Sequence, residues 1–499
     1  MRADLLAKAR DFFLRHPLAV SLGLALVFRL WSAVFNYTPL AEDDYANVIG
    51  PALQALQTGI PVHTVAYRLD IFPRLFYLIL FPFHALGVVD PRTLVSIGYA
   101  ALAFVSLASV WGMHKLGGNF LSAGGQALLT LLTAVYFLSP LITTKCLLES
   151  FSMNAVPWAF YFITKKQSRP RDYFWGALFL GLAVILRFQN SVLAIAAAGC
   201  LLLLAGMKKI SGRDIAFFFL AGLISLLVLA GLDLLSHRLP LSTLWNYVDY
   251  NFRGNVLHSG YGRSAWYVYV GFFLCVFIPP FSLVLLWPFI RGIPRTWIVA
   301  VAFFAYVLFH SLIANKLDRF MLPVVPLFFL ITFAGLESLK DPGGLKKSRL
   351  VRGAWIGFWI LNCLLVIPVC LSKSQTSIID AALYLRQIDA PVYMKGIALW
   401  KQGYRGYDRP EPQKVRDLPG FVAGIDRSRM KDFYFLNFLP MEKAERGLFE
   451  SRGYRVDLVE KFAPSLLEKL VIKANPLRNK RRMTTYLYRI SFPAAGVFI

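Results

Sequence analysis

Three consecutive acidic residues, Glu42, Asp43 and Asp44, lie in the segment LAEDDYANVIGPALQALQTG, which begins at Leu40. The segment follows an apolar stretch, so the acids lie at a bilayer surface if that stretch crosses a membrane. Neighbouring carboxylates repel one another, and partial desolvation makes a carboxylate a stronger base, which suits a general base. A structural alternative is a helix cap, because an Asp before YANVIGPALQAL can bind the free N–H groups of a helix N-terminus. The charge pattern leaves both roles open.

Basic residues stand at several predicted helix ends: Arg68 before IFPRLFY, Lys145 in TTKC, Arg187 in ILRFQN, and Lys316 and Arg319 in ANKLDRF. A lipid phosphate at the membrane interface needs cations, and arginine offers a two-pronged donor for it. We therefore take Arg68, Arg187, Lys316 and Arg319 as candidates for binding a donor phosphate. The alternative is that these side chains reach lipid headgroups, as basic residues at helix ends commonly do.

The loop PLSTLWNYVDYNFRGNVLHSGYGR, from Pro240 to Arg263, is rich in aromatic residues, Asn and Gly. Such loops stack on sugar rings and bind their hydroxyl groups, which makes Trp245 and Tyr247 candidates for acceptor or sugar binding. Aromatic residues near a bilayer are also ordinary interfacial anchors.

Metal and nucleic-acid binding find no support in the residue pattern. The seven histidines, His258 among them, and the five cysteines lack metal-ligand spacing, so we expect no metal site, no disulfide and no cofactor. Near the C-terminus lies a basic cluster that would suggest nucleic acid in a soluble protein: Arg478, Lys480, Arg481 and Arg482. In this chain an anionic lipid surface or a solvated face is the expected environment, and membrane lipids are the expected partners.

The elements that must position these residues are membrane-spanning helices. The 499 residues are 57% hydrophobic and 16% charged, against about 25% charged in soluble domains. Apolar runs near the required ~20 residues predict about eleven spans, at 17–36, 92–113, 121–140, 147–164, 172–187, 190–206, 214–236, 265–290, 296–313, 320–338 and 353–371. The apolar segment 71–87 is interrupted by Pro73 and Pro82, and whether it crosses the membrane decides the topology of everything after it.

Charge asymmetry predicts the topology, because short cytoplasmic loops are enriched in Lys and Arg. Basic clusters at 165–171, 208–213 and 346–352 share one side if 71–87 does not cross. We therefore expect a cytoplasmic N-terminus, large non-cytoplasmic loops at 37–91 and 237–264, and a transmembrane module over 1–371. Residues 372–499 have no run long enough to span, which predicts a soluble or membrane-surface domain. We expect a small non-cytoplasmic α/β domain there.

The order of these motifs resembles glycosyltransferase family 22, the GT-C-fold mannosyltransferases that use polyprenyl- or dolichyl-phosphate sugars. EDDY, from Glu42 to Tyr45, resembles the family's acidic first-loop motif, and Arg68 and Pro73 follow at a suitable distance. The segment Arg187–Asn190 is similar to its Arg-Pro-Thr-Ser motif. Residues Asn315–Phe320, NKLDRF, are similar to its His-Lys-Glu-(Glu or Asp)-Arg-Phe motif, although Asn315 replaces the His and Leu317 replaces the first acid.

The resemblance implies an inverting transfer of a hexose, with mannose expected, from a polyprenyl-phosphate carrier to an acceptor glycan or lipid hydroxyl on the non-cytoplasmic face. Asp43 is then the expected general base with Asp44 as the neighbouring alternative, and Glu42 and Tyr45 join the acceptor or sugar contacts. Lysine and arginine stabilise the leaving lipid phosphate without a metal.

Two rival functions remain open. A lipid-linked-sugar flippase or other transporter would place ionisable groups deep in its spans, whereas the middles of these runs are nearly free of them. A GT-C transferase for another sugar, such as aminoarabinose or glucose, fits the same motifs. The compact loops favour a bacterial inner membrane over the endoplasmic reticulum.

Overall fold

A computed structural model of the chain describes residues 8, 11–253, 264–339, 345–396, 400–426, 430–474 and 483–492. The chain divides into two compact units. Unit 1 comprises Met1–Ala33, Thr64–Ile71 and Tyr99–Cys370, and unit 2 comprises Val34–His63, Phe72–Gly98 and Leu371–Ile499. Most of the predicted first loop therefore belongs to the same unit as the C-terminal residues.

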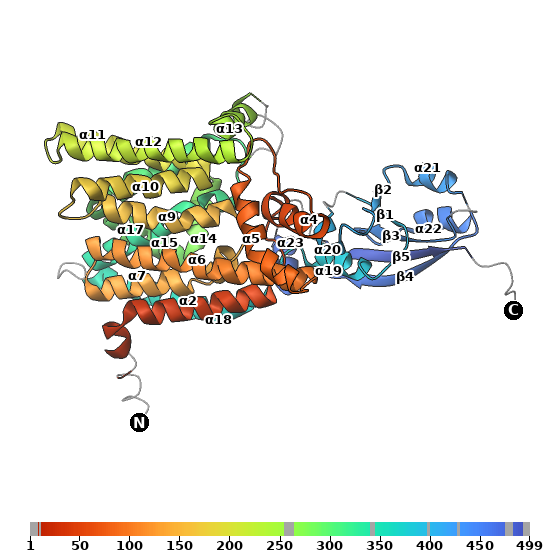
Figure 1. The fold of residues 1–499 in the computed structure, drawn as a ribbon. Coiled ribbons are helices and arrows are strands. Elements are labelled where there is room, and N and C mark those ends of the chain that lie inside the picture. Colours follow the sequence, from red (N-terminus) through yellow and green to blue (C-terminus); the bar gives the residue numbers. More distant parts are fainter. Residues whose placement is uncertain are drawn as a thin grey trace. The chain divides into compact units, whose positions relative to one another are not determined.

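Unit 1 consists of helices joined by short connections (Figure 1). Its longer helices are α2 (Pro17–Phe35), α6 (Pro91–Phe120, from Tyr99 onward in this unit), α7 (Ala123–Val135), α9 (Leu148–Ile163), α10 (Pro170–Leu186), α11 (Ser191–Gly206), α12 (Gly212–Leu235), α13 (Ser242–Phe252), α14 (Val268–Val276), α15 (Phe281–Gly292), α16 (Trp297–Leu312), α17 (Val325–Ser338) and α18 (Leu345–Leu371). Short turns precede or link them: α8 (Ser139–Thr143), η2 (Phe188–Asn190), η4 (Pro294–Thr296) and η5 (Asp318–Val324).

Each of the eleven predicted spans coincides with a helix or a helix pair. Seven helical stretches in the described residues are long and apolar enough to cross a membrane: Pro17–Phe35, Pro91–Phe120, Phe188–Gly206, Gly212–Leu235, Pro294–Leu312, Asp318–Ser338 and Arg349–Leu385. A bent pair, α14 with α15, makes eight if it is one span. Helices α7, α9 and α10 have 13, 16 and 17 residues and fall short of that length. The chain is a multi-pass membrane protein.

The prediction of one continuous span at 265–290 is wrong. Helices α14 and α15 meet at an angle of 99°, and Pro279 and Pro280 occupy the break between them. Proline lacks a backbone N–H and its ring clashes with the preceding turn, so two adjacent prolines end a helix.

Pro73 and Pro82, by contrast, do not interrupt their segment. Helix α5 runs unbroken from Ile71 to Ala85. Pro73 lies in the first turn, where no N–H is needed, and only Pro82 removes an internal hydrogen bond. At 15 residues the helix is about 22 Å long, which is less than the ~30 Å of a hydrocarbon core.

Helix α17 lies at the centre of unit 1. Every residue from Val325 to Gly335 is buried, as expected for a helix that is apolar on all sides. Its closest neighbour is α15, where glycines allow the two backbones to touch. A Cβ added at Gly335 would lie 1.7 Å from the Pro288 carbonyl oxygen, and one added at Gly292 would lie 1.8 Å from that of Ile331.

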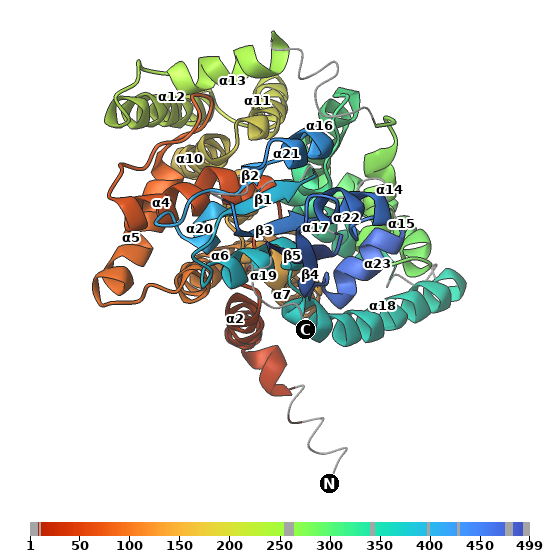
Figure 2. The same ribbon diagram turned by 90° about the vertical axis from the view of Figure 1, so that its right-hand side faces the viewer.

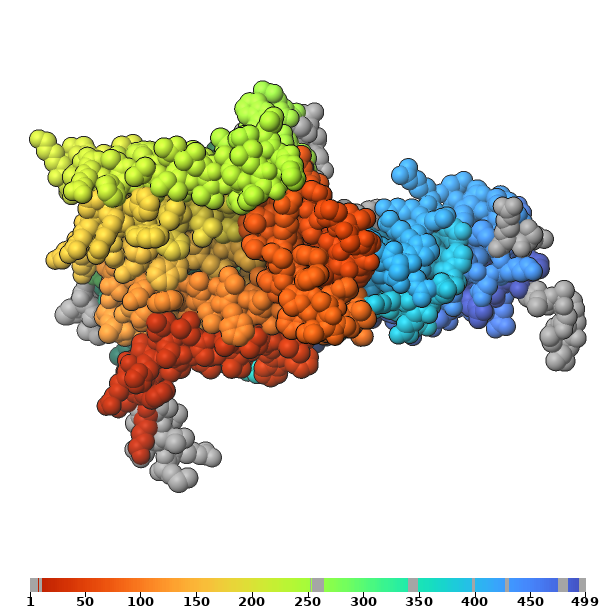
Figure 3. All heavy atoms as spheres, in the orientation of Figure 1, coloured from red at the N-terminus to blue at the C-terminus, as the bar shows by residue number. Residues whose placement is uncertain are grey.

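Helix α12 lies instead at the edge of unit 1, where Figure 3 shows its yellow-green outer face uncovered. Its buried residues form one stripe at helical spacing: Phe218, Ala221, Ser225, Leu229 and Asp233. Helix α2 also buries one stripe, which contains small and polar residues and includes Arg29.

Unit 2 combines first-loop helices with a C-terminal sheet domain. The loop forms α3 (Glu42–Asp44), a wider π-helical turn η1 (Tyr45–Ile49), α4 (Gly50–Thr58) and α5. The C-terminal part contains α19 (Thr376–Leu385), α20 (Gln402–Arg405), α21 (Leu418–Ala423), α22 (Lys443–Glu450) and α23 (Leu466–Ala474).

The C-terminal sheet has five strands in the order β2-β1-β3-β5-β4 (Figure 2). The strands are β1 (Val392–Lys395), β2 (Gln413–Lys414), β3 (Asp432–Asn437), β4 (Arg455–Phe462) and β5 (Thr485–Ser491). Strand β1 pairs in parallel with β2 and β3, whereas β5 runs antiparallel to β3 and β4. Phe433, Phe435 and Phe449 are fully buried in its core. The predicted small α/β domain is confirmed.

Candidate active site

The first-loop carboxylates of unit 2 have distinct environments. Asp44 is buried, and its carboxylate accepts hydrogen bonds from the backbone N–H groups of Leu40 (2.7 Å), Ala41 (3.0 Å) and Tyr45 (3.0 Å). These three bonds fix the turn that starts the helical part of the loop. Asp44 therefore performs the capping role that the sequence left open.

Glu42 and Tyr45 contact the segment that contains α20. Glu42 forms an ion pair with Lys401, whose side chain is fully buried. The Lys401 ammonium also lies 4.6 Å from the centre of the Tyr45 ring. The Tyr45 hydroxyl accepts a hydrogen bond from the Gly403 N–H at 2.8 Å, and burial raises the pKa of this phenol well above its ordinary value. Both side chains thus join the loop to the C-terminal domain.

Asp43 lies between Glu42 and Asp44 and is only partly buried. It belongs to the three-residue helix α3, at the N-terminal end of the helical stretch that continues to Thr58.

In unit 1, two arginines converge on one carboxylate. Arg187 Nη2 lies 3.1 Å from Glu149 Oε1, and Arg319 Nε lies 3.4 Å from the same oxygen. The side chains of Arg187 and Glu149 are 4% and 3% exposed, and that of Arg319 is 17% exposed. One negative and two positive charges are therefore held together in a largely dry part of the unit.

The motif after α10 orients Arg187. The side chain of Gln189 accepts a 3.0 Å hydrogen bond from Arg187 Nε, while the Asn190 amide donates to the Ala183 carbonyl at the end of α10. Phe320 lies beneath both guanidinium groups, with its ring centre 5.2 Å from Arg187 and 5.8 Å from Arg319. An arginine on an aromatic face is held in position without losing its donors.

Lys316 makes a different set of contacts. Its ammonium donates to the backbone carbonyls of Ile313 (2.5 Å) and Ser264 (3.1 Å), and the residue is only 3% exposed. Burial lowers the pKa of this lysine. In this structure Lys316 closes the end of α16, and its described partners do not include Glu149.

Arg68 and Tyr247, which the sequence predicts to bind phosphate and sugar, lie where residues 64–71 pack against the segment after α12. The Arg68 carbonyl accepts from Arg238 Nη1 at 2.5 Å, and Arg238 also pairs with Asp70 at 2.9 Å. Tyr247 contacts Phe188 edge to face at 5.1 Å, which places it next to the Arg187 motif.

Trp245, in contrast, is 61% exposed and lies under Arg253 at 5.5 Å. His258 and the rest of 254–263, like the basic cluster Arg478–Arg482, lie outside the described residues. Within the residues that are described, no group of three or more His, Cys, Asp or Glu side chains is placed to hold a metal ion.

Sequence reasoning missed Glu149 and Lys401. Glu149 is a lone acid in KCLLES at the start of an apolar helix. An acidic residue in an apolar, membrane-spanning segment is energetically unfavourable unless it is paired with a cation. The isolated Glu149 could therefore have been predicted to pair with a basic residue. Lys401 is 359 positions from its partner Glu42, so nothing in its local sequence indicates the pair.

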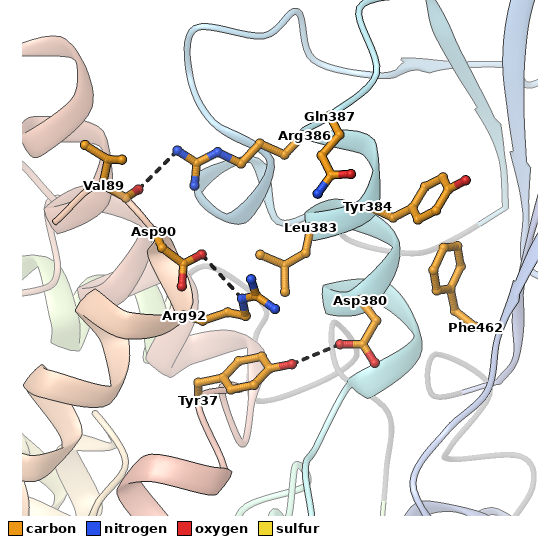
Figure 4. Close-up of a pocket in the computed structure, with 10 residues that line it drawn as sticks. All are labelled: Tyr37, Val89, Asp90, Arg92, Asp380, Leu383, Tyr384, Arg386, Gln387 and Phe462. Atoms are coloured by element: carbon orange, nitrogen blue, oxygen red, sulfur yellow. Dashed lines mark hydrogen bonds and ion pairs between the residues drawn. The ribbon is translucent and has the colours of Figure 1, made fainter.

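Unit 2 also contains a pocket of about 630 Å³, within the usual range of about 300–1,000 Å³ for ligand sites. Figure 4 shows its lining: Tyr37, Val89, Asp90, Arg92, Asp380, Leu383, Tyr384, Arg386, Gln387 and Phe462. The Tyr37 hydroxyl donates to Asp380 at 3.2 Å, and Arg92 donates to Asp90 at 3.3 Å. Its two carboxylates and two guanidinium groups balance in charge, so the pocket suits a neutral ligand with hydroxyl groups.

Comparisons with known proteins identify the family and the fold of the chain. The Alg9-like mannosyltransferase family matches residues 21–396, whereas no curated protein sequence matches the chain. The solved structure of ArnT from Cupriavidus metallidurans in the apo state has a TM-score of 0.57 and 10% identity, over 94% of this chain and 97% of that one. Its structure bound to undecaprenyl phosphate has the same TM-score, identity and coverage.

Two further solved structures share the architecture. The Archaeoglobus fulgidus oligosaccharyltransferase in complex with Zn and sulfate has a TM-score of 0.51 and 11% identity, over 87% of this chain and 69% of that one. The arabinofuranosyltransferase AftD from mycobacteria has a TM-score of 0.52 and 14% identity, over 95% of this chain and 40% of that one. At these identities the likeness establishes the fold, and the family match covers most of the chain. The protein is therefore a membrane glycosyltransferase with the GT-C fold, and it belongs to the Alg9-like mannosyltransferase family.

Proposed function

We propose that the protein transfers a hexose, with mannose as the expected sugar, from a polyprenyl-phosphate carrier to an acceptor glycan or lipid hydroxyl. The observation that carries this proposal is the convergence of Arg187 and Arg319 on Glu149 inside the membrane unit. Two guanidinium groups that share one carboxylate retain a net positive charge. They can therefore receive a lipid phosphate, the group that the ArnT structure binds as undecaprenyl phosphate.

The arginines stabilise the leaving group. As the bond between the anomeric carbon and the phosphate oxygen breaks, negative charge grows on the phosphate, and preorganised donors in a dry site favour that change. Before the donor binds, Glu149 keeps the two guanidinium groups in place. Lys316 and Arg68 remain proposed phosphate ligands, although Lys316 would first have to release the carbonyls that it binds.

Asp43 is the proposed general base. It takes the proton of the acceptor hydroxyl while that oxygen attacks the anomeric carbon from the face opposite the phosphate, which inverts the configuration. Its position in the first-loop acidic motif supports this role, and the three backbone bonds of Asp44 give that neighbour a capping role instead. Proton transfer of this kind contributes about 10²- to 10⁴-fold to a rate.

For the acceptor, Trp245 and Tyr247 remain proposed sugar contacts, and Tyr247 adjoins the Arg187 motif through Phe188. Glu42 and Tyr45 shape the loop in our proposal through their contacts with Lys401 and Gly403. The charge-balanced pocket of unit 2 is a further place for the distal part of an acceptor saccharide.

We also propose a bacterial inner membrane as the location, with a cytoplasmic N-terminus and with the first loop and the C-terminal domain on the far side. Charge asymmetry between the loops supports this orientation. An endoplasmic reticulum membrane would keep the same orientation relative to the cytoplasm.

A donor panel tests the proposal. Purified protein in lipid nanodiscs is given polyprenyl-phosphate mannose, glucose and aminoarabinose, and carrier release and product anomeric configuration are measured. We expect release from the mannose donor with inversion, and a loss of about tenfold or more in donor affinity for Arg187→Gln. Arg213→Gln, which removes an exposed arginine of α12, is the matched control. Movement of lipid-linked sugar across vesicles without any carrier release would establish the transporter instead.

A further inference from the structure

Arg29 is a fully buried arginine inside a membrane-spanning helix. It lies on α2, six residues before the helix ends at Phe35, which places its Cα about 9 Å from that end. The residue has 0% of its surface exposed, so its guanidinium does not reach the interface in the way that basic side chains at helix ends commonly do. Sequence reasoning gave this residue no role.

Among the described residues, no acidic group forms an ion pair with Arg29. Nη1 donates to the Ser106 hydroxyl at 2.8 Å, whereas Nε and Nη2 have no hydrogen-bond partner there. Ser106 is itself neutral and donates onward to the Ala103 carbonyl. A buried charge without an opposite charge is strongly unfavourable, so this arrangement calls for an anion or for water.

Arg29 lines a cavity of unit 1. Its volume is about 100 Å³, which exceeds the ~10–15 Å³ that a single water needs but is below the ~300 Å³ of a usual ligand site, so it suits a small head group and not a whole lipid. Arg29, Thr133 and Ser139 give it polar groups, whereas Ile142, Phe272 and Phe329 give it apolar walls. The cavity therefore combines one positive charge with a surface that suits a hydrocarbon chain.

The cavity reaches the outside of unit 1. Cys275 lines it and is an exposed residue of α14, and α14 is part of the bent pair that is apolar enough to span. A ligand can therefore enter from the surrounding lipid. A free inorganic anion, in contrast, would have to cross hydrocarbon to arrive there.

We propose that this cavity is an anion site for a lipid phosphate, with the phosphate on Arg29 and the first carbons of its apolar chain along Phe272 and Phe329. The site is separate from the Glu149 cluster, because none of its lining residues is Arg187, Arg319 or Lys316. The phosphate can belong to a phospholipid headgroup or to an isoprenyl phosphate. Both present charged oxygens to the two unpartnered nitrogens and an apolar chain to the walls.

Native mass spectrometry of the intact protein tests the site. Delipidated protein in detergent is titrated with phosphatidylglycerol, with a long-chain isoprenyl monophosphate and with inorganic phosphate. We expect a saturable lipid-phosphate adduct whose affinity falls at least about tenfold in Arg29→Gln, as loss of a charge-assisted contact predicts. Arg213→Gln should bind as wild type does, and Arg187→Gln should keep this adduct while losing the donor.

A second variant guards against misfolding of Arg29→Gln. Ile142→Trp leaves the arginine in place and narrows the cavity at a partly exposed residue, so it should also lose the adduct. Selective loss of the isoprenyl adduct identifies a carrier lipid as the occupant, and loss of the phosphatidylglycerol adduct identifies a membrane phospholipid. Unchanged lipid binding in both variants, or full occupancy by inorganic phosphate alone, would overturn the proposal and leave water as the solvent of Arg29.

Discussion

Replacing Glu149 with Gln separates two roles that its carboxylate has in this structure. The substitution keeps the size of the side chain and one acceptor oxygen, but it removes the negative charge between Arg187 and Arg319. The buried Arg187 and the partly buried Arg319 then lie close together without a negative charge between them. We expect a less stable empty protein that nevertheless binds the donor phosphate more tightly, because the phosphate no longer competes with a carboxylate for the arginines.

The expected size follows from the two contacts. At an effective dielectric constant of about 20, a unit charge pair at 3.1 Å is worth ~5 kcal/mol, and the 3.4 Å pair is worth nearly as much. Desolvation offsets much of this attraction, and removing one partner of a buried pair costs about 3–5 kcal/mol in practice. Because Gln keeps an acceptor for one guanidinium, we expect a loss of about 3 kcal/mol in the free energy of unfolding.

Thermal unfolding in nanodiscs, with and without an isoprenyl phosphate, measures both effects in one experiment. The midpoint of empty Glu149→Gln should fall by several degrees, and its rise on adding the phosphate should exceed that of wild type. Unchanged stability would show that the carboxylate does not hold the arginines. A drop in both stability and phosphate binding would refute the competition and make Glu149 a residue that positions the arginines for the donor.

Three further experiments test the first-loop acids, the packing of α17 and the orientation in the membrane. Asp43→Asn should lower turnover by about 10²- to 10⁴-fold in a folded protein, whereas Asp44→Asn should chiefly lower stability, by about 1–3 kcal/mol, because Asn cannot replace all three accepted bonds; wild-type rates in both would exclude a first-loop base. Gly335→Ala should lower the unfolding midpoint, since its Cβ would meet the Pro288 carbonyl, whereas Gly222→Ala on α12 meets nothing within 4 Å and should not. Cysteines placed in 237–264 and after Leu371 should be labelled from outside intact cells and those in 341–352 spared; the reverse pattern would contradict the proposed orientation.

The helices were largely predictable from the sequence because lipid imposes a long apolar run on each span. The effect of each proline on its helix was harder to predict from the sequence. Pro73 lies in a first helical turn and leaves α5 intact, whereas Pro279 and Pro280 end α14. Hydropathy does not distinguish these prolines. Whether a proline interrupts a helix depends on its position relative to the first helical turn.

The candidate site was predictable in part. The motif cations Arg187 and Arg319 do lie together, but the acid that joins them comes from a different helix and has no spacing relation to either. Asp43 and Asp44 are chemically identical neighbours, and the backbone direction at residues 40–45 decides which of them becomes the cap. The role of Asp43 as base stays a prediction.

Helix α17 bears on how the protein assembles. Together with η5 it forms a stretch that is long and apolar enough to cross a bilayer, yet from Val325 to Gly335 it has only protein around it. Exchanging lipid neighbours for protein neighbours brings no gain in hydrophobic burial, so close van der Waals packing must drive that step. Gly292 and Gly335 provide it by letting two backbones meet. A substitution in α17 should therefore preserve stability when the new side chain has the shape of the old one. On the outer face of α12, any side chain that is soluble in lipid should preserve it.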